Sequence, residues 1–277
     1  MPSDDWQHLA NEWIHALRHA GRAPGTLALY QRTALLFAQR GVDAVLPLTL
    51  APSTRRQRYD VLHAFLIWCD RSGARPGAPG LLAAVPIPHS PEPPPRAVPA
   101  DALTRITDQV RRLPLKWRTY FTLVLETGMR SGEAVRIRVR DIDLSTLGRE
   151  SVRVLGKGGR ERIIPLPAGF ASRPLLKRLI RERIAPDAFL FSKSRTGDMP
   201  MTTAAARYQW ARVLKAAGVA GYSIHSLRHT VATRLVERVG DLSLAQRLLG
   251  HASLRTTARY TVRGEAALRK AMEQSAL

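Results

Sequence analysis

The first 85 residues carry an apolar pattern with the period of amphipathic helices. The first predicted helix gathers its large apolar side chains on one face: Trp6, Leu9, Trp13 and Leu17. A second helix is predicted to start with Thr26 as its cap and to end at Gly41, and a third to begin near Ser53 or Thr54. Residues 1–85 therefore predict a small all-helical domain.

A proline-rich stretch, residues 86–99, interrupts this helical pattern. Seven of its fourteen residues are proline, which neither continues a helix nor donates to a sheet ladder. Such a stretch is extended and semi-stiff. A proline-rich peptide ligand would have a similar composition, but the position between two patterned regions favours a linker between domains.

Helical and strand patterns mix in residues 100–277. Helices are predicted in four places: residues 101–112, residues 117–126, from Ser131 onward, and through most of the chain after about Ala204. Residues 151–155 and 160–165 alternate between apolar and polar positions around Gly156-Lys157-Gly158-Gly159, which predicts a β-hairpin with a glycine-rich tip. The predicted fold class is mostly α with a small β-hairpin or sheet, an all-helical domain followed by an α+β domain.

The composition adds a strong positive charge to this picture. Lys and Arg total 43 against 22 Asp and Glu, which gives a formal net charge of +21 over 277 residues. A compact body with that excess repels itself unless a polyanion is its partner, and nucleic acid is the leading candidate. A ribosomal-type or merely arginine-biased protein would show the same excess. Charge therefore supports binding and says nothing about catalysis.

Cysteine content and hydropathy narrow the setting in which the chain works. The single cysteine, Cys69, excludes an internal disulfide and a cysteine-based metal cluster. No segment approaches the roughly 18–20 apolar residues that a membrane span needs. The first residues lack the basic-then-apolar pattern of a signal peptide. We expect a soluble, cytoplasmic protein that does not bind membranes.

Two arginines are candidates for holding a phosphate. The non-bridging oxygens of a phosphodiester gain negative charge in the transition state of cleavage, and without a metal other cations must stabilise it. Arg130 follows a Thr-Gly turn and Arg228 lies three residues after His225; each guanidinium offers a planar fork of donors and stays protonated. Preorganised donors of this kind are worth roughly 3–4 kcal/mol each. A single arginine in so basic a chain is more often a surface or ion-pair residue.

Histidines and a tyrosine follow in the last quarter of the chain. His225 would share a helical face with Arg228, and an imidazole can take a proton from a hydroxyl at neutral pH. His229 points elsewhere and is assigned to structure. His251 follows a glycine that could end a helix, which would leave its ring free to donate to a phosphate oxygen. Tyr260 is a poor nucleophile unless its proton is removed, and alone it would be an ordinary packed tyrosine.

Other charged residues carry weaker signals. Lys157 at the hairpin tip could enter a minor groove or protonate a leaving oxygen, although a lysine in a turn is usually just solvated. Glu133, one helical turn after Arg130, could orient that arginine. Three arginines open the third predicted helix and could equally face DNA phosphates or form a solvated surface: Arg55, Arg56 and Arg58. The histidine spacing and the glycine-rich tip do not match metal or nucleotide motifs, so neither kind of site is predicted.

Four strings in the second half resemble those of the tyrosine recombinase, or phage-integrase-type, family. They are Thr-Gly-Met-Arg-Ser-Gly-Glu, Gly-Lys-Gly-Gly-Arg-Glu-Arg, His-Ser-Leu-Arg-His-Thr-Val-Ala-Thr and Leu-Leu-Gly-His-Ala-Ser-Leu-Arg-Thr-Thr-Ala-Arg-Tyr. They span about residues 100 to 262 in the family's order. Six positions that carry the family's chemistry agree: Arg130, Lys157, His225, Arg228, His251 and Tyr260.

The resemblance implies a role for each of these positions. Tyr260 would attack the scissile phosphate and give a 3′-phosphotyrosine and a free 5′-hydroxyl. The two arginines would hold the non-bridging oxygens, with a further hydrogen bond from His251. His225 would be the general base and Lys157 the general acid, and Glu133 matches the family's supporting acidic position. No metal or other cofactor is implied.

The resemblance also implies an architecture and an assembly. Residues 1–85 would be the core-DNA-binding domain, residues 86–99 the linker and residues 100–277 the catalytic domain, ending in a helix over residues 264–277. The implied activity is Xer-like site-specific recombination of double-stranded DNA by a homotetramer on two sites, or with a partner recombinase or accessory protein, through a Holliday junction. Two alternatives remain: a type IB topoisomerase-like relaxing enzyme and a non-catalytic DNA-binding protein of the same fold.

Overall fold

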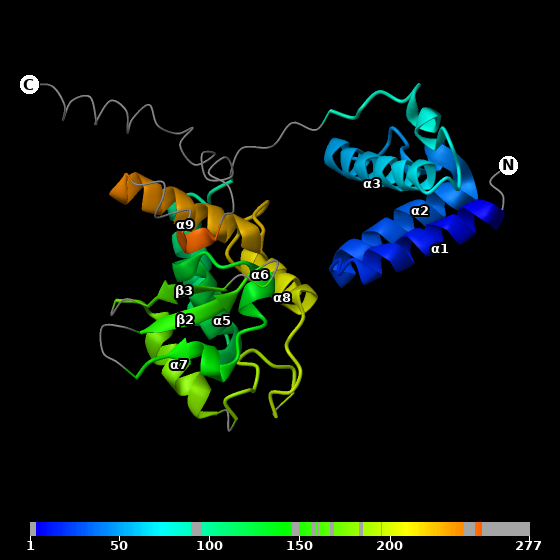
Figure 1. Cartoon of the computed structure of the whole chain (residues 1–277). Helices are drawn as coiled ribbons and strands as arrows, with labels where there is room; N and C mark the ends of the chain where they lie inside the picture. The colour runs from blue at the N-terminus through cyan, green and yellow to red at the C-terminus, as the bar shows by residue number, and fades with distance from the viewer. Residues whose placement is uncertain are drawn as a thin grey trace, which may run out of the picture. The chain divides into compact units, whose positions relative to one another are not determined.

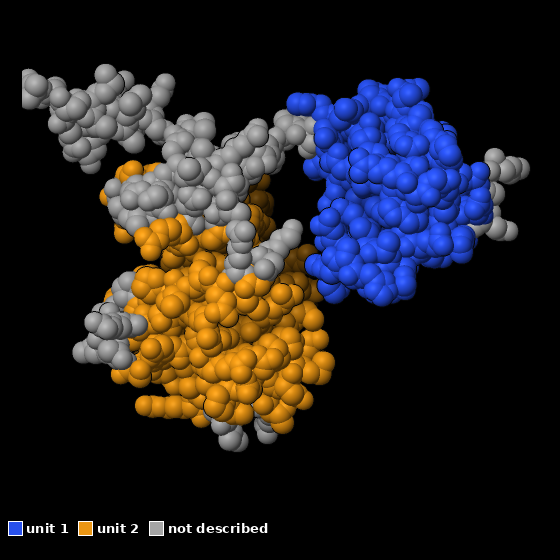
Figure 2. Space-filling view, viewed as in Figure 1, with its two compact units in different colours: residues 1–92 blue, residues 93–277 orange. Residues whose placement is uncertain are grey.

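The structure of the chain is a computed structural model that describes residues 4–89, 96–145, 150–156, 159, 161–166, 169–182, 185–194, 196–240 and 247–250. The chain divides into two compact units, residues 1–92 (unit 1) and residues 93–277 (unit 2), coloured separately in Figure 2. Each unit has a hydrophobic core of its own.

Unit 1 is helical throughout its described regular elements. These elements are α1 (Asp4–His19), α2 (Pro24–Val45), α3 (Pro52–Arg71) and the short 3-10 helix η1 (Ala78–Leu82), coloured from blue to cyan in Figure 1. Aromatic rings join the three long helices: Trp13 packs on Phe65 at 5.1 Å between centroids, and Trp6 meets Phe37 at 5.0 Å. The apolar face predicted for the first helix lies in this core, so that prediction is confirmed.

Gly41 interrupts α2. As the sequence pattern predicted, the regular helix from Pro24 stops at Gly41, which has a non-helical conformation (φ 76°, ψ −174°), and a second short helical stretch runs on to Val45. Glycine adopts a positive φ without a Cβ penalty, so the chain can bend here and resume its helix. α3 begins at Pro52, slightly before the predicted start, because the fixed φ of proline suits the first turn of a helix.

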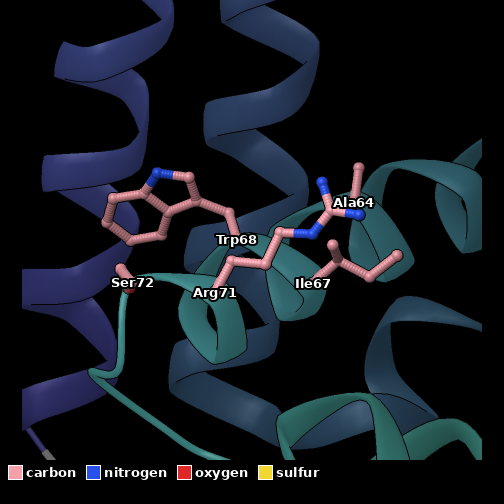
Figure 3. A pocket seen from close by; sticks show the side chains of 5 residues that line it. All are labelled: Ala64, Ile67, Trp68, Arg71 and Ser72. Atoms are coloured by element: carbon pink, nitrogen blue, oxygen red, sulfur yellow. The ribbon is translucent and has the colours of Figure 1, made fainter.

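A pocket opens along α3 on the surface of unit 1 (Figure 3). Five side chains line it: Ala64, Ile67, Trp68, Arg71 and Ser72. An indole ring and a guanidinium group therefore border the same apolar hollow. Within the described helices of the chain, no segment has both the length and the apolar character needed to cross a bilayer.

Unit 2 combines helices with a small sheet (Figure 1). Its described elements are α4 (Ala100–Arg111), α5 (Leu115–Thr127), α6 (Ser131–Ala134), η2 (Val139–Asp141), β1 (Ile142–Asp143), β2 (Ser151–Leu155), β3 (Glu161–Pro165), α7 (Ser172–Arg181), α8 (Thr203–Ala216) and α9 (Ile224–Val239). α5 contacts α4, α7 and α9 and so occupies the centre of the unit. Its Phe121 packs on Trp210 of α8 at 5.3 Å between ring centroids.

β2 and β3 form the predicted hairpin. They pair antiparallel, with Leu155 opposite Glu161 beside the tip, and Val152 and Val154 point into the core. β1 adds a third antiparallel strand through the pairing of Ile142 with Val152, in the order β1-β2-β3. β1 is only two residues long, too short for an alternating pattern to show. The predicted fold class, mostly α with a small sheet, is confirmed.

Candidate active site

The turn after α5 brings the segment of Arg130 against α9. α5 ends at Thr127, and Gly128 follows with φ 64°. A Cβ placed on Gly128 would lie 3.1 Å from Leu249 Cδ2 and 3.2 Å from the Cβ of Val231 on α9. Glycine meets both the positive φ and this close approach. The Thr-Gly pair of the sequence therefore sets where Arg130 enters the site.

Arg130 is held by the carboxylate of Glu133. Arg130 caps the N-terminus of α6: its backbone N–H donates to Glu133 Oε2 at 2.8 Å and its Nη1 to Oε1 at 2.9 Å. The Glu133 side chain is 6% exposed, whereas that of Arg130 is 40% exposed. Glu133 therefore fixes one edge of the guanidinium while much of the Arg130 side chain stays accessible to a ligand.

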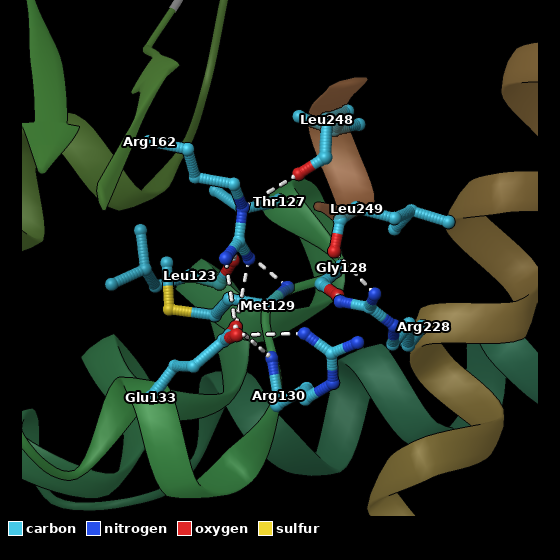
Figure 4. A network of polar contacts seen from close by, with 10 residues as sticks. All are labelled: Leu123, Thr127, Gly128, Met129, Arg130, Glu133, Arg162, Arg228, Leu248 and Leu249. Atoms are coloured by element: carbon cyan, nitrogen blue, oxygen red, sulfur yellow. Dashed lines mark hydrogen bonds and ion pairs between the residues drawn. The ribbon is translucent and has the colours of Figure 1, made fainter. Parts of the chain in front are cut away.

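Arg162 of β3 shares the same carboxylate (Figure 4). Its Nη1 and Nη2 donate to the two oxygens of Glu133 at 3.0 and 2.7 Å, and its Nε donates to the carbonyl oxygen of Leu248 at 3.0 Å. Burial by itself would raise the pKa of Glu133, but the hydrogen bonds from Arg162 and Arg130 outweigh it and lower the pKa to about 2. Glu133 is therefore ionised at neutral pH.

Arg228 of α9 is 1% exposed. Its Nη1 donates to the carbonyl oxygen of Gly128 at 3.0 Å, across 100 sequence positions, and its Nη2 donates to the carbonyl oxygen of Leu249. A carbonyl is a dipole without a net charge. These two bonds therefore hold the guanidinium in one orientation.

Two histidines of α9 lie on either side of Arg228 in the sequence. His225 is exposed, yet partial burial of its ring and the charges of Arg228 and Arg130 lower its pKa below the ordinary 6.5. Burial, His225 and Arg228 lower the pKa of His229 to about 4. The two rings pack edge to face at 4.7 Å between centroids. Both imidazoles are therefore neutral at neutral pH, the form that accepts a proton.

The structure brings together four residues singled out in the sequence: Arg130, Glu133, His225 and Arg228. Three others, Lys157, His251 and Tyr260, lie outside the described residues, as does the helix expected over residues 264–277. The described stretch 247–250 immediately precedes His251 in the sequence, and Gly250 has φ 63°. Three of the six expected catalytic positions are thus described, together with the supporting Glu133.

The three arginines singled out in α3 belong to unit 1, and each makes a contact within that unit. Arg55 Nε donates to the carbonyl oxygen of Leu46 at 3.1 Å, and Arg58 Nη1 to that of Val45 at 3.3 Å. Arg56 forms an exposed ion pair at 2.9 Å with an aspartate one turn along α3. Since Val45 and Leu46 close α2, two of the three arginines satisfy carbonyls at a helix end.

Arg162 received no role from the sequence, although the strand pattern held a signal for it. In β3, Arg162 and Ile164 occupy the inward positions of the alternation. A charged side chain on the inward face of a strand requires a partner, because burying an unpaired charge is costly. That argument predicts a carboxylate opposite Arg162, and Glu133 is that carboxylate.

Comparison with known proteins identifies the family of this chain. Residues 96–265 match the phage integrase family. This chain belongs to the phage integrase family. It is 34% identical over 235 residues to the tyrosine recombinase XerC of Myxococcus xanthus, a match that covers 81% of this chain and 76% of the relative. The XerC of Rhodospirillum centenum is 31% identical over 281 residues, covering 91% of this chain and 74% of the relative.

A third relative covers less of each chain. The tyrosine recombinase XerC of Staphylococcus haemolyticus is 39% identical over 159 residues, which are 56% of this chain and 52% of that protein. This match thus spans about half of the relative's length. The family match and the two longer matches identify this chain as a tyrosine-type site-specific recombinase.

Solved structures share the fold at low sequence identity. The XerH site-specific recombinase bound to a palindromic difH substrate matches with a TM-score of 0.69 and 22% identity over 89% of this chain and 79% of that one. Lambda integrase bound to DNA matches with a TM-score of 0.71 and 18% identity over 93% and 96% of the two chains. At these identities the likeness concerns the fold, and it confirms the predicted recombinase fold class.

Proposed function

We propose that Tyr260 of this recombinase cuts one strand of double-stranded DNA and that the strand is rejoined to a partner duplex through a Holliday junction. The observation that carries this proposal is the meeting of Arg130, Arg228 and His225, which come from segments about 100 positions apart. Two cations suit the non-bridging oxygens of a phosphodiester, and a neutral imidazole beside them suits the proton of an attacking phenol.

The proposed step exchanges one phosphate ester for another. The Tyr260 phenolic oxygen forms a bond to the scissile phosphorus while the bond to the 5′-oxygen breaks. His225 takes the phenolic proton, Lys157 supplies the proton that the departing 5′-oxygen needs, and His251 donates a hydrogen bond to the phosphate. A 3′-phosphotyrosine and a free 5′-hydroxyl result. Because the phosphoester is conserved, a 5′-hydroxyl from the partner duplex reverses the step without an added energy source.

Because they differ in burial, Arg228 and Arg130 have different tasks in this proposal. The Arg228 guanidinium, oriented by two backbone carbonyls, is a fixed cation whose field is little weakened by water. Arg130 is more accessible and is oriented through Glu133. The fixed guanidinium of Arg228 and the accessible guanidinium of Arg130 together match a phosphate that must first bind and then gain negative charge.

The proposed working assembly is a tetramer on two DNA sites. Lambda integrase has been solved as a tetramer bound to a Holliday junction. We propose the same assembly for this chain, as a homotetramer or with a partner recombinase, acting on DNA in the cytoplasm. Residues 1–85 would be its core-DNA-binding domain, with contacts from Arg55, Arg56 and Arg58.

Trapping of the covalent intermediate tests the catalytic step. Duplexes drawn from the genomic neighbourhood of the gene, nicked beside candidate cleavage positions, are incubated with the protein without metal, and protein–DNA adducts are resolved on a denaturing gel. We expect an adduct that Tyr260→Phe abolishes. Tyr208→Phe is the matched control, since Tyr208 is 69% exposed on α8 and has no proposed role.

Two outcomes would contradict the proposal. An adduct of undiminished yield in Tyr260→Phe would assign the nucleophile to another residue. Relaxation of supercoiled plasmid without strand transfer between two duplexes would assign the chemistry to a relaxing enzyme.

A further inference from the structure

Arg162 uses three of its donor nitrogens to join two segments of unit 2 that are distant in sequence. Its two terminal nitrogens donate hydrogen bonds to both oxygens of Glu133, and its Nε donates to the carbonyl oxygen of Leu248, 86 positions away. Figure 4 shows the Glu133 carboxylate between the guanidiniums of Arg162 and Arg130. One side chain therefore links the Arg130 segment to the stretch that immediately precedes His251 in the sequence.

The surroundings of Arg162 keep this link in one geometry. Its side chain is 13% exposed and that of Glu133 6%, so water competes little for the charged hydrogen bonds. A Cβ on Gly250 would lie 3.1 to 3.3 Å from the Cδ, Nη1 and Nε atoms of Arg162. The turn at Gly250 thus packs directly on the Arg162 side chain, which leaves little room for either partner to shift.

The charges of the cluster give Arg162 a second effect. Glu133 alone would offset the positive charge of Arg130, the residue that meets the phosphate in the proposed function. With Arg162 also bound to the same carboxylate, two cations share one anion and the cluster keeps a net positive charge. Arg162 therefore lets Glu133 orient Arg130 without removing the charge that the phosphate requires.

We propose that Arg162 is a positioning residue for DNA cleavage, acting through Glu133 on Arg130 and through Leu248 on the turn before His251. This inference rests on the proposed function, because it concerns the same phosphate site. Arg162 is not expected to touch DNA, so its loss should slow the chemical step while DNA affinity is kept. Partners of this indirect kind typically change activity about 10- to 100-fold when they are removed.

The test compares Arg162→Gln and Arg162→Lys with the wild type in three measurements. These are the rate constant of adduct formation at saturating DNA, the dissociation constant for DNA, and the thermal unfolding midpoint. We expect Arg162→Gln to cleave about 10- to 100-fold more slowly with an unchanged dissociation constant. Arg162→Lys keeps the charge but lacks the planar fork, so it should be only partly active. If Arg162→Gln fails to fold, Arg162→Lys carries the comparison.

A matched control and a double-mutant cycle separate positioning from general damage. Arg153 lies on β2 of the same sheet, its side chain is 47% exposed, and it pairs with Asp141, so Arg153→Gln should cleave at the wild-type rate. Arg162→Gln and Glu133→Gln should be strongly non-additive, because one acts through the other. If the rate defects of the two single variants multiply in the double variant, the proposal is overturned.

Further outcomes are equally decisive. Wild-type cleavage in Arg162→Gln or in Arg162→Lys would overturn the proposal, as would a loss of cleavage that merely follows a loss of folded protein or of DNA affinity. Failure of the proposed function looks different, since the wild type itself would then form no adduct that depends on Tyr260.

Discussion

Both units of the chain present clusters of arginines, but the surroundings of these side chains differ. In unit 1, Arg58 is half-buried against a helix end and Arg56 is an exposed member of an ion pair. In unit 2, Arg162 and Arg130 share a buried carboxylate and Arg228 is nearly inaccessible to water. A charge in water is screened and its contacts are weak, whereas a fixed charge in a dry site acts strongly on a neighbour. The first setting suits reversible contacts with a DNA backbone, and the second suits stabilisation of a transition state.

Burial alone does not make an arginine part of the catalytic site, and Arg173 offers the sharpest way to show this. Arg173 of α7 forms an ion pair with Glu150, and the two side chains are 11% and 2% exposed. Arg173→Met leaves Glu150 without this partner, so we expect the free energy of unfolding to fall by about 3–5 kcal/mol. The part of the variant that remains folded should cleave DNA at the wild-type rate.

Denaturant unfolding and single-turnover cleavage below the unfolding transition measure these two effects. The double variant Arg173→Met with Glu150→Leu should recover much of the lost stability, because the buried carboxylate that loses Arg173 is removed together with it. A slow but fully folded Arg173→Met would give this pair a part in the chemistry.

Arg130 should show the opposite behaviour. Because its side chain is 40% exposed and Arg162 remains to pair with Glu133, Arg130→Gln should change stability little. Loss of a preorganised donor costs about 100- to 1000-fold in the rate of the chemical step. The rate constant of adduct formation at saturating DNA measures this loss. Arg136→Gln, at an exposed position just after α6, is the control and should cleave normally; equal rates in the two variants would remove Arg130 from the site.

Local sequence patterns predicted most of the fold because its helices and hairpin bury faces with regular periods. α7 was not predicted, and its start shows why. The Glu126 carboxylate of α5 accepts the backbone N–H groups of Ala171 and Ser172 at 2.7 and 3.1 Å. The group that caps this helix thus lies about 45 positions away in the chain. The first turn of α7 is therefore stabilised by a residue that is distant in the sequence.

The site could be predicted only as far as single residues stand in distinctive surroundings. Arg130 and Arg228 were found because each lies in a characteristic string of residues. Arg162 ends another such string, residues 156–162, but its role could not be read there, since it depends on Glu133 and Leu248, which lie 29 and 86 positions from it. The spacing of chemically active residues is visible in a sequence, whereas the contacts that hold them exist only in the folded chain.

Acid should weaken the protein through the histidines of unit 2. The pKa of His229 is about 4 in the fold, below its ordinary 6.5, so the unfolded chain binds more protons between these values. The free energy of unfolding should therefore fall as the pH drops from 6.5 towards 4. Glu133, whose pKa is lowered from 4.5 to about 2, keeps its full contribution above pH 4.5 and loses it only as the pH falls towards 2. The interval between pH 6.5 and 4.5 thus isolates the histidines.

Denaturant unfolding across that interval measures the effect. His229→Gln should flatten the dependence of the free energy of unfolding on pH, because it removes a group with a lowered pKa. His63→Gln, in α3 of unit 1, is the control and should leave the slope as in the wild type. Identical slopes in wild type and His229→Gln would contradict the assignment.

The smallest expected effects separate the arginines of α3 from one another. Arg58→Gln removes the donor to the Val45 carbonyl and should lower the free energy of unfolding by about 1 kcal/mol. Arg56→Gln should change it by less than about 0.5 kcal/mol, because its ion pair is exposed. If Arg56 neutralises a DNA phosphate, the plot of log K against log salt concentration for DNA binding should be less steep by about 0.9 in Arg56→Gln than in the wild type. Fluorescence anisotropy over a salt series measures that slope, with Arg18→Gln, at an exposed position near the end of α1, as the control. An equal slope in Arg56→Gln and wild type would make Arg56 a solvated surface residue, and the contrast between the two arginine clusters would then rest on unit 2 alone.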